Sequence, residues 1–215
     1  MTAIIQQIEP PALPLATDRY ERPYQDQLNN VQRLFYNRLT STVNSVVGQD
    51  GGKNLQFPHA MLMSDQDQAN AGVTSENLVT YNVPVLQQAI EVRNGSQIWF
   101  DQTGQYLVTF SLMFTNRGNA AQEIEVWAKS DGTNYPLSNT RLDIAARKSL
   151  SVWAHAVATI TGIFTVTDPD TNYLSIAWWS DGPDVFLESY PEGINPTRPA
   201  IPSVILTVNF VSRLP

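Results

Sequence analysis

The sequence has no cysteine and two histidines among its 215 residues. The absence of cysteine excludes disulfide bonds, thiolate metal sites, iron–sulfur clusters and cysteine nucleophiles. His59 and His155 do not form the His-Glu-Xaa-Xaa-His pattern of a helical zinc site. No two glycines are separated by a single residue, so a dinucleotide-binding fingerprint is also absent. We therefore expect no cofactor, no metal and no catalytic residues, and we predict that the chain is not an enzyme.

Charged residues are scarce, at 15% of the chain against roughly 25% in ordinary soluble domains. Lys and Arg number 13 and Asp and Glu number 20, and the basic residues are not clustered, so we expect no nucleic-acid partner. The apolar runs fall short of the roughly 20 residues that cross a bilayer, and the first residues show no secretory signal. We expect no membrane partner. The uncharged polar composition suits surfaces that meet other proteins.

Composition divides the chain into three segments. Residues 1–23 contain four prolines and predict an extended arm. Residues 24–52 predict a helix and linker, because glycines at 48–52 follow apolar residues spaced by three and four, namely Tyr24, Leu28, Val31, Phe35, Leu39, Val43 and Val46. The spacing is a heptad seam with one stutter, which fits a short coiled coil. It fits equally well an amphipathic helix that lies on its own domain.

Residues 53–215 predict an all-β jelly-roll sandwich, because short stretches of alternating apolar and polar residues are separated by turn residues. The densest core face belongs to 104–115, with Tyr106, Val108, Phe110, Leu112 and Phe114 on one side. Further strands are expected at 57–63, 76–83, 89–93, 97–101, 122–129, 149–161, 172–180, 184–190 and 202–211. Turns are expected at 118–119, 131–132 and 181–183, and at the Asn-Gly-Ser of 94–96, which also fits a glycosylation acceptor.

Two of the expected strands carry apolar residues on both faces. In 149–161, Trp153 and Val157 lie opposite a face of aliphatic residues, and in 172–180, Tyr173 and Trp179 lie opposite Trp178 and its neighbours. A sheet with two apolar faces is covered on both. One cover is the sandwich core, and the other is a loop, an arm or another copy of the chain.

The last two-thirds of the chain resembles the tumour necrosis factor/complement-type jelly roll, which assembles as a threefold trimer. The resemblance rests on Thr-Gly-Gln-Tyr-Leu-Val-Thr-Phe-Ser at 103–111, on 123–136, on 149–161 and on 199–211. The last of these, with Ser-Asn-Thr-Arg-Leu at 138–142, is also similar to virion proteins of tailed bacteriophages. Arg-Leu-Phe-Tyr-Asn-Arg-Leu at 33–39 and Phe-Pro-His-Ala at 57–60 extend that similarity over roughly residues 24–213.

The resemblance implies a homotrimer that is formed by one sheet. This inner sheet would contain the strands near 57–63, 104–115, 172–180 and 202–211, and its outer face would meet two neighbouring copies. The trimer interface would contain the residues on the non-core face of those strands, namely Leu107, Met113, Tyr173, Trp179 and Ile205. Loops of the same chain could instead cover some of them.

The resemblance also implies a non-enzymatic structural component of a bacteriophage virion, assembled in the host cytoplasm. It would be a decoration or cement protein, or a fibre-type appendage, that binds capsid or tail proteins. The arm and helix would attach it to the particle through apolar anchors, namely Ile4, Ile5, Ile8, Leu13, Leu15, Leu28, Val31 and Phe35.

Two alternatives stay open. The trimer could be a receptor-binding module at a fibre tip that recognises a host glycan or surface protein through exposed aromatic residues, for which the candidates are Trp127, Tyr135 and Tyr190. A glycan-cleaving enzyme is retained because carboxylates are plentiful. The acidic turns at 168–170 and 181–184 fit a calcium site, but ordinary turn chemistry explains them better.

Overall fold

The computed structural model describes residues 12–13, 19, 21–47 and 57–214 and divides the chain into two compact units, Met1–Gln56 and Phe57–Pro215. The first unit contains α1 (Arg22–Val47), which begins two residues before the predicted start and has Pro23 in its first turn, where proline is favoured. Along α1, the predicted anchors Leu28, Val31 and Phe35 are half-buried. Within the described residues, no helix is long and apolar enough to cross a membrane.

Most of the predicted attachment arm lies outside the described residues. This applies to Ile4, Ile5, Ile8 and Leu15, and to the glycine-rich end of the helical segment at 48–52. Leu13 is described and is exposed. Attachment through the arm therefore stays a prediction.

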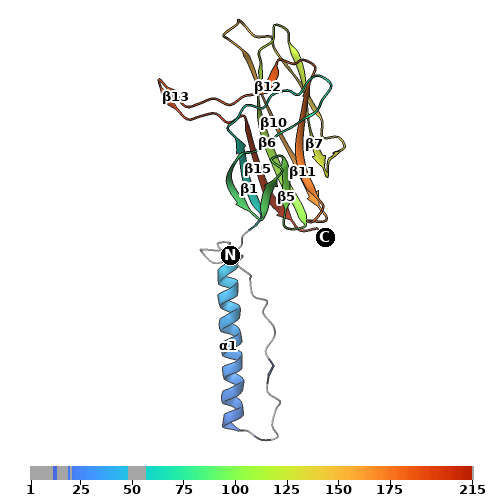
Figure 1. The fold of residues 1–215 in the computed structure, drawn as a ribbon. Coiled ribbons are helices and arrows are strands. Elements are labelled where there is room, and N and C mark those ends of the chain that lie inside the picture. The colour runs from blue at the N-terminus through green and yellow to red at the C-terminus, as the bar shows by residue number, and fades with distance from the viewer. Residues whose placement is uncertain (1–11, 14–18, 20, 48–56, 215) are drawn as a thin grey trace. The chain divides into compact units, whose positions relative to one another are not determined.

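The second unit is a sandwich of two antiparallel sheets (Figure 1). Sheet 1 has the order β10-β6-β15-β1-β3, with β12 beside β6, and consists of β1 (His59–Ser64), β3 (Val83–Gln88), β6 (Gly104–Asn116), β10 (Ala154–Val166), β12 (Val185–Leu187) and β15 (Val204–Ser212). Sheet 2 has the order β4-β5-β11-β7-β8, and in addition β2 pairs with β11 and β9 pairs with β7. Its strands are β2 (Asn77–Leu78), β4 (Ile90–Arg93), β5 (Gln97–Phe100), β7 (Gln122–Ser130), β8 (Thr133–Asn134), β9 (Thr140–Ile144) and β11 (Tyr173–Ser180).

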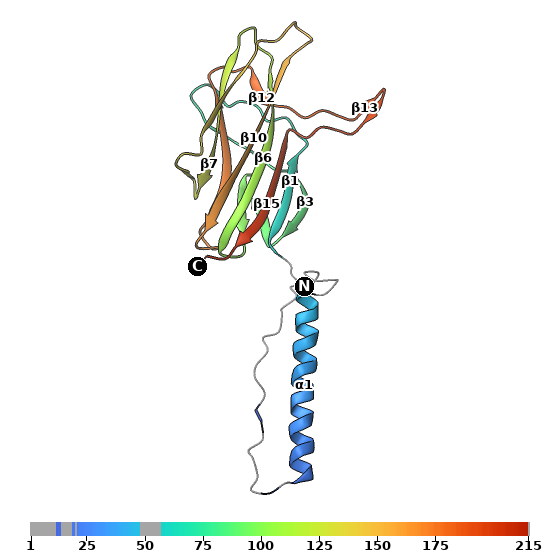
Figure 2. The ribbon, with the colours of Figure 1, turned by 180° about the vertical axis from the view of Figure 1, so that it is seen from behind.

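The chain passes repeatedly from one sheet to the other, from β5 to β6, β6 to β7, β9 to β10, β10 to β11 and β11 to β12. This alternation between two packed antiparallel sheets is the jelly-roll arrangement. The predicted fold class, an all-β sandwich preceded by one helix, is confirmed. A two-stranded hairpin, β13 (Gly193–Ile194) and β14 (Thr197–Arg198), projects away from the sandwich in both ribbon views (Figures 1 and 2).

The core lies between the sheets and follows the predicted alternation. In β6, the side chains of Tyr106, Val108, Phe110, Leu112 and Phe114 are all buried, while the residues between them point outward. The Phe114 ring meets the fully buried Trp178 of β11 edge to face, with ring centroids 5.4 Å apart. Such offset aromatic pairs add stability beyond the area that they bury. The predicted core face of 104–115 is therefore confirmed.

Two predicted hairpin turns are confirmed by their backbone angles. Asn94 and Gly95 have φ of 51° and 74°, and Asp131 and Gly132 have φ of 53° and 77°. Ser130 pairs with Thr133, so Asp131 and Gly132 form a two-residue type I′ turn, whose twist matches that of the flanking strands. Arg93 pairs with Gln97, so the loop at 94–96 has three residues. The Asn-Gly-Ser of 94–96 is accordingly the turn between β4 and β5.

Several predicted strands are wrong in extent. The strand expected at 149–161 begins at Ala154, because Ser149 and Val152 form a tight turn with mutual backbone hydrogen bonds. Residues 76–83 form no continuous strand: β2 pairs with β11 in sheet 2, and β3 starts at Val83 on the edge of sheet 1. Pro84 is accommodated at that edge. Strand β9 and the β13–β14 hairpin were not predicted.

The predicted composition of the inner sheet is also wrong in one strand. Residues 172–180 form β11, which pairs with β7 and β5 in sheet 2, and β10 takes the predicted place beside β6 in sheet 1. Both strands carry apolar residues on both faces, and this pattern does not reveal which neighbour a strand pairs with.

Candidate functional site

The outer face of sheet 1 is formed by five adjacent strands (Figure 2). We define it by the side chains that point away from the core, namely His59, Met61, Met63, Val83, Leu86, Gln88, Gln105, Leu107, Thr109, Ser111, Met113, His155, Val157, Thr159, Thr161, Ile163, Thr165, Ile205, Thr207 and Asn209. None of these residues is Asp, Glu, Lys or Arg. Since solvent-exposed sheet faces normally carry charges, an uncharged face across five strands is a candidate interaction surface.

The strand registers arrange this face in rows. One row runs Ile163–Leu107–Asn209–His59 across β10, β6, β15 and β1, and the next runs Thr161–Thr109–Thr207–Met61. The hydroxyl groups of adjacent strands pair with one another: Thr109 and Thr161 lie 3.0 Å apart, and Ser111 and Thr159 lie 3.1 Å apart. In each pair one hydroxyl donates to the other, so one hydroxyl proton of the pair is left for an acceptor on a protein surface that covers the face.

Apolar side chains on this face are open to solvent. Val157 is 60% exposed, Ile163 55% and Leu107 37%. Five strands at a spacing of ~4.8 Å, with ~27 Å of strand from Gln105 to Met113, give a planar area on the order of 650 Å². That area approaches the ~800 Å² that each partner contributes to a standard stable interface.

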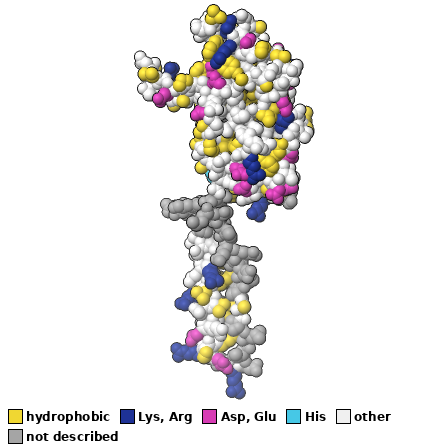
Figure 3. All heavy atoms as spheres, viewed as in Figure 1, with side chains coloured by type: hydrophobic (Ala, Val, Ile, Leu, Met, Phe, Trp, Pro, Cys, Tyr) yellow, Lys and Arg dark blue, Asp and Glu magenta, His cyan; other side chains and the backbone are white. Residues whose placement is uncertain are grey.

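The charged pairs of the β-domain lie mostly on sheet 2 and its loops. Arg93 pairs with Glu91 in β4, Lys129 of β7 pairs with Glu76, and Arg141 of β9 pairs with Glu123 of β7. The space-filling view shows acidic and basic side chains distributed over the domain on the side drawn there (Figure 3). The absence of charge from the outer face of sheet 1 is thus a local property and not a property of the whole surface.

Three of the five residues predicted for a trimer interface lie on this face: Leu107, Met113 and Ile205. The prediction that Tyr173 and Trp179 share the face is wrong, because both belong to β11 in sheet 2. Contacts within the chain cover them there, as the loop alternative anticipated.

The outward side chains of β11 are covered by other segments of the same chain. The Tyr173 ring stacks on Trp99 at 5.1 Å between centroids, and the indole Nε1 of Trp179 donates a hydrogen bond to the carbonyl of Val73 at 2.6 Å. The ion pair between Glu76 and Lys129 holds the same loop against sheet 2. The second apolar face of β11 is therefore accounted for within one chain.

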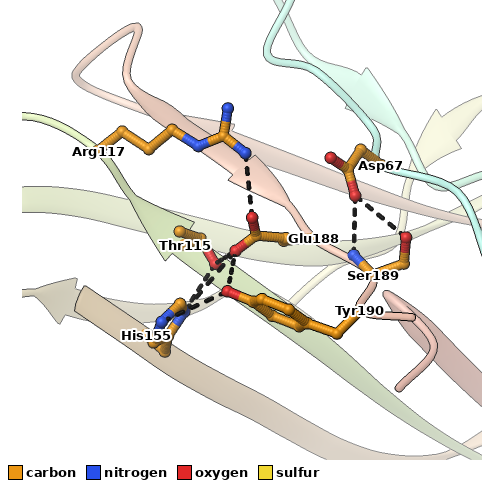
Figure 4. Close-up of polar contacts among 7 residues, drawn as sticks. All are labelled: Asp67, Thr115, Arg117, His155, Glu188, Ser189 and Tyr190. Atoms are coloured by element: carbon orange, nitrogen blue, oxygen red, sulfur yellow. Dashed lines mark hydrogen bonds and ion pairs between the residues drawn. The ribbon is translucent and has the colours of Figure 1, made fainter. Parts of the chain in front are cut away.

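A polar network around the buried side chains of Thr115 and Glu188 lies where β6, β10 and the residues after β12 meet (Figure 4). The Glu188 carboxylate accepts hydrogen bonds from Thr115 Oγ1 at 2.6 Å, from Arg117 at 3.0 Å and from the Tyr190 hydroxyl. The Thr115 oxygen also lies 2.9 Å from Nδ1 of His155. Because the single hydroxyl proton of Thr115 goes to Glu188, Nδ1 of His155 must be the donor to Thr115. The network fixes the orientation of His155 at one end of the uncharged face.

The neighbours of this network brace it further. The Arg117 guanidinium lies between two aromatic rings, 4.0 Å from the centroid of Trp153 and 3.8 Å from that of Phe186. Next to Glu188, Asp67 accepts hydrogen bonds from the backbone N and the hydroxyl of Ser189 at 2.9 and 3.1 Å. These contacts join β6, β10, β12 and the 65–68 loop, and we interpret the network as structural.

The three predicted ligand-contact aromatics do not lie together. Trp127 is on the outward side of β7, as predicted, and lines a surface hollow with Tyr135. Tyr190 lies in the Glu188 network, where burial and the hydrogen bond to Glu188 raise its pKa to about 12. Its hydroxyl is therefore committed to an internal contact.

The acidic turns are explained by backbone contacts. Asp168 accepts a hydrogen bond from the backbone N of Asp170 at 3.0 Å, and Asp181 accepts one from the backbone N of Glu123 at 2.7 Å. In the described part of the chain, no group of three or more Asp, Glu or His side chains is placed to hold a metal ion. The Asp168 contact is that of an ordinary turn.

Comparisons with known proteins concern the fold. No family model matches the sequence, and no match is found among curated proteins. The similar solved structures include the crystal structures of murine APRIL at pH 5.0 and at pH 8.5, which contain a jelly-roll domain of the tumour necrosis factor family. Each has a TM-score of 0.42 and 14% sequence identity, over 72% of this chain and 100% of that chain.

Proposed function

We propose that the chain is a non-enzymatic structural component of a bacteriophage virion, built as a homotrimer whose β-domains associate through the outer face of sheet 1. Its arm and helix attach the trimer to capsid or tail proteins as a decoration, cement or fibre-type appendage. The observation that carries the association is the uncharged outer face of sheet 1. The virion setting rests on the sequence similarity over residues 24–213.

A second copy of the chain is the occupant that best fits this face. Any protein that buries it must offer a surface that is itself uncharged, because a buried unpaired charge costs several kcal/mol. The same chain provides such a surface in every copy. Peripheral Val157 and Ile163 supply apolar contacts, and the hydroxyl pair of Thr109 and Thr161 supplies one hydroxyl proton that a neighbouring copy can accept.

The projecting hairpin offers a second contact between copies. Ile194 at its end is 90% exposed, and the bridge between Tyr190 and Ile201 closes its base against the domain. An exposed aliphatic side chain on an extended hairpin gains stability when another surface buries it. In a trimer the hairpin would reach a neighbouring copy.

The N-terminal segment attaches the trimer to the particle. An arm that orders on docking must offset roughly 1–2 kcal/mol of backbone entropy per residue, and prolines lower that cost by stiffening the free chain. Three arms on one trimer add avidity. The anchors remain those predicted, including Ile4, Ile5, Ile8 and Leu15.

The test of this function is a chain that lacks residues 1–23. We expect it to remain a trimer in solution and to be absent from purified particles, as measured by mass spectrometry of virions assembled with the truncated gene. Full-length protein supplied in the same way is the control. Incorporation of the truncated chain at wild-type occupancy would overturn attachment through the arm.

A further inference from the structure

A hollow of about 280 Å³ lies on the outer side of sheet 2, between β7 and the segment that connects β8 to β9. Strand β7 contributes two side chains and the 134–139 segment contributes the other four, so the lining consists of Glu125, Trp127, Asn134, Tyr135, Leu137 and Asn139. Sequence reasoning selected Trp127 and Tyr135 separately. The structure brings them together and adds two carboxamides.

The two carboxamides are held in defined orientations. The indole Nε1 of Trp127 donates to Oδ1 of Asn134 at 2.9 Å, and an indole N–H can only donate. Asn134 must therefore turn its oxygen toward Trp127, and its amino group is left as a donor. Asn139 donates from Nδ2 to the Glu125 carboxylate at 2.7 Å, so its oxygen is left as an acceptor. One oriented donor and one oriented acceptor thus line the same hollow.

Glu125 is the one charged side chain among the six that line the hollow, and Arg141 beside the hollow pairs with it. Nε of Arg141 donates to Glu125 at 3.0 Å, and Arg141 also lies 3.3 Å from Glu123. Hydrogen bonds from Asn139 and Arg141 lower the pKa of Glu125, which therefore stays ionised and paired at neutral pH. With two carboxylates against one guanidinium, an anionic ligand would be repelled. The chemistry of the hollow favours an uncharged polar ligand.

The apolar side of the hollow includes a residue in an unfavourable backbone conformation. Leu137 has a φ of 59°, a left-handed conformation that is unfavourable for a residue with a branched side chain, and its side chain is fully exposed. The backbone N of Tyr135 donates to the carbonyl of Ala128 at 2.9 Å, and the Ser138 hydroxyl donates to the carbonyl of Tyr135 at 2.8 Å. These contacts hold the Tyr135 and Leu137 backbone at the rim beside Trp127.

We propose that this hollow binds a neutral saccharide. A pyranose ring has an apolar C–H face that packs on an aromatic ring, here Trp127 with Tyr135 and Leu137 beside it. Neighbouring hydroxyls of the same ring act as both donor and acceptor, which matches the amino group of Asn134 and the oxygen of Asn139. The site does not depend on the trimer, so it extends the proposed structural role with a recognition function.

The test uses the full chain and a panel of immobilised neutral, sialylated and sulfated glycans. The neutral glycan that binds most strongly is then titrated into ¹⁵N-labelled protein, and the indole N–H signals of Trp127 and Trp99 are followed. We expect the Trp127 signal to shift and the Trp99 signal to stay. We expect Trp127→Ala to weaken binding at least tenfold and Asn139→Ala about fivefold.

Trp99→Ala is the matched control, because Trp99 is a half-buried tryptophan on the same face of sheet 2 but stacks on Tyr173 and lies outside the hollow. It should leave the affinity unchanged. If Trp127→Ala fails to fold, the affinities of Asn134→Ala and Asn139→Ala for the glycan are measured instead. The proposal is overturned if no neutral glycan binds, if only sialylated or sulfated glycans bind, or if these variants bind like the wild type.

Discussion

Replacing Leu107 with Glu tests the role of the uncharged face. Leu107 lies on β6 between Ile163 and Asn209 and is 37% exposed. In a single domain the new carboxylate would stay in water, and the change of strand propensity would cost at most about 1 kcal/mol. In an assembly that buries the face, the carboxylate would lose its hydration and would find no cation, because the face has none.

The expected magnitude is large. An unpaired buried charge costs several kcal/mol. At about 3 kcal/mol for each copy, three copies lose about 9 kcal/mol, which corresponds to more than a millionfold in the association constant at 1.4 kcal/mol per factor of ten. A trimer of micromolar or even nanomolar stability would dissociate at ordinary working concentrations.

The assay is size-exclusion chromatography with light scattering at micromolar concentration. Leu78→Glu is the matched control, because Leu78 is a leucine of similar exposure, 42%, on β2 of sheet 2. We expect Leu107→Glu to elute with the mass of one chain, 24.0 kDa, with a circular dichroism spectrum like that of the wild type. Retention of the wild-type mass by Leu107→Glu, or loss of that mass in Leu78→Glu as well, would refute the reasoning.

Three further predictions concern the stability of the domain. Glu188→Gln removes the charge that accepts three hydrogen bonds and should lower the free energy of unfolding in urea by about 2 kcal/mol; an unchanged midpoint would contradict the structural role of the network. Burial is the main cause that raises the pKa values of Tyr106 and Tyr190 to about 12, while the unfolded chain releases these protons near pH ~10. Above that pH the native state binds more protons than the unfolded state, so the free energy of unfolding should fall as the pH rises from 10 to 12. Circular dichroism follows the unfolding and tyrosinate absorbance follows the ionisation, and a free energy of unfolding that stays constant over this range would contradict the prediction. Gly104→Ala places a Cβ 2.7 Å from a backbone oxygen of β15, whereas at Gly162 a Cβ meets nothing within 4 Å. Gly104→Ala should lower the free energy of unfolding by about 1–3 kcal/mol, and Gly162→Ala should leave the melting temperature unchanged or higher. Equal effects of the two changes would contradict the packing.

Local signals in the sequence predicted much of the β-domain. The alternation in 104–115 identified β6 and its core face, and the Asn-Gly and Asp-Gly dipeptides identified two hairpins. Both features depend only on residues that are close in the sequence. The pleat of a strand places alternate side chains on opposite faces, and a hairpin turn needs residues that tolerate a positive φ. The start of β10 was missed because the Ser149–Val152 turn has no such dipeptide.

The pairing of strands and the grouping of side chains could not be predicted in the same way. Periodicity gives the two faces of β11 but not its neighbours, so its residues were assigned to the wrong sheet. The cover over Trp179 comes from Val73, far away in the sequence. Glu188 carries no local signal, because its partners Thr115 and Arg117 approach it only in the folded domain.

The uncharged face itself is a consequence of that pairing. Each strand alone contributes three to six uncharged outward residues, which is unremarkable in a chain with 15% charged residues. Only the order β10-β6-β15-β1-β3 places them side by side. The sequence resemblance predicted an interface on this sheet, and the structure supplies the surface on which the proposal rests.

The measurement that tests the central claim most directly is the solution mass of the wild-type protein by light scattering, on the full chain and on a chain that starts at Gly52. The account predicts a trimer in both cases, about 72 kDa for three full chains of 24.0 kDa. That result would locate the association in the β-domain. A monomer in both cases would contradict the trimer and, with it, the proposed role of the uncharged face of sheet 1.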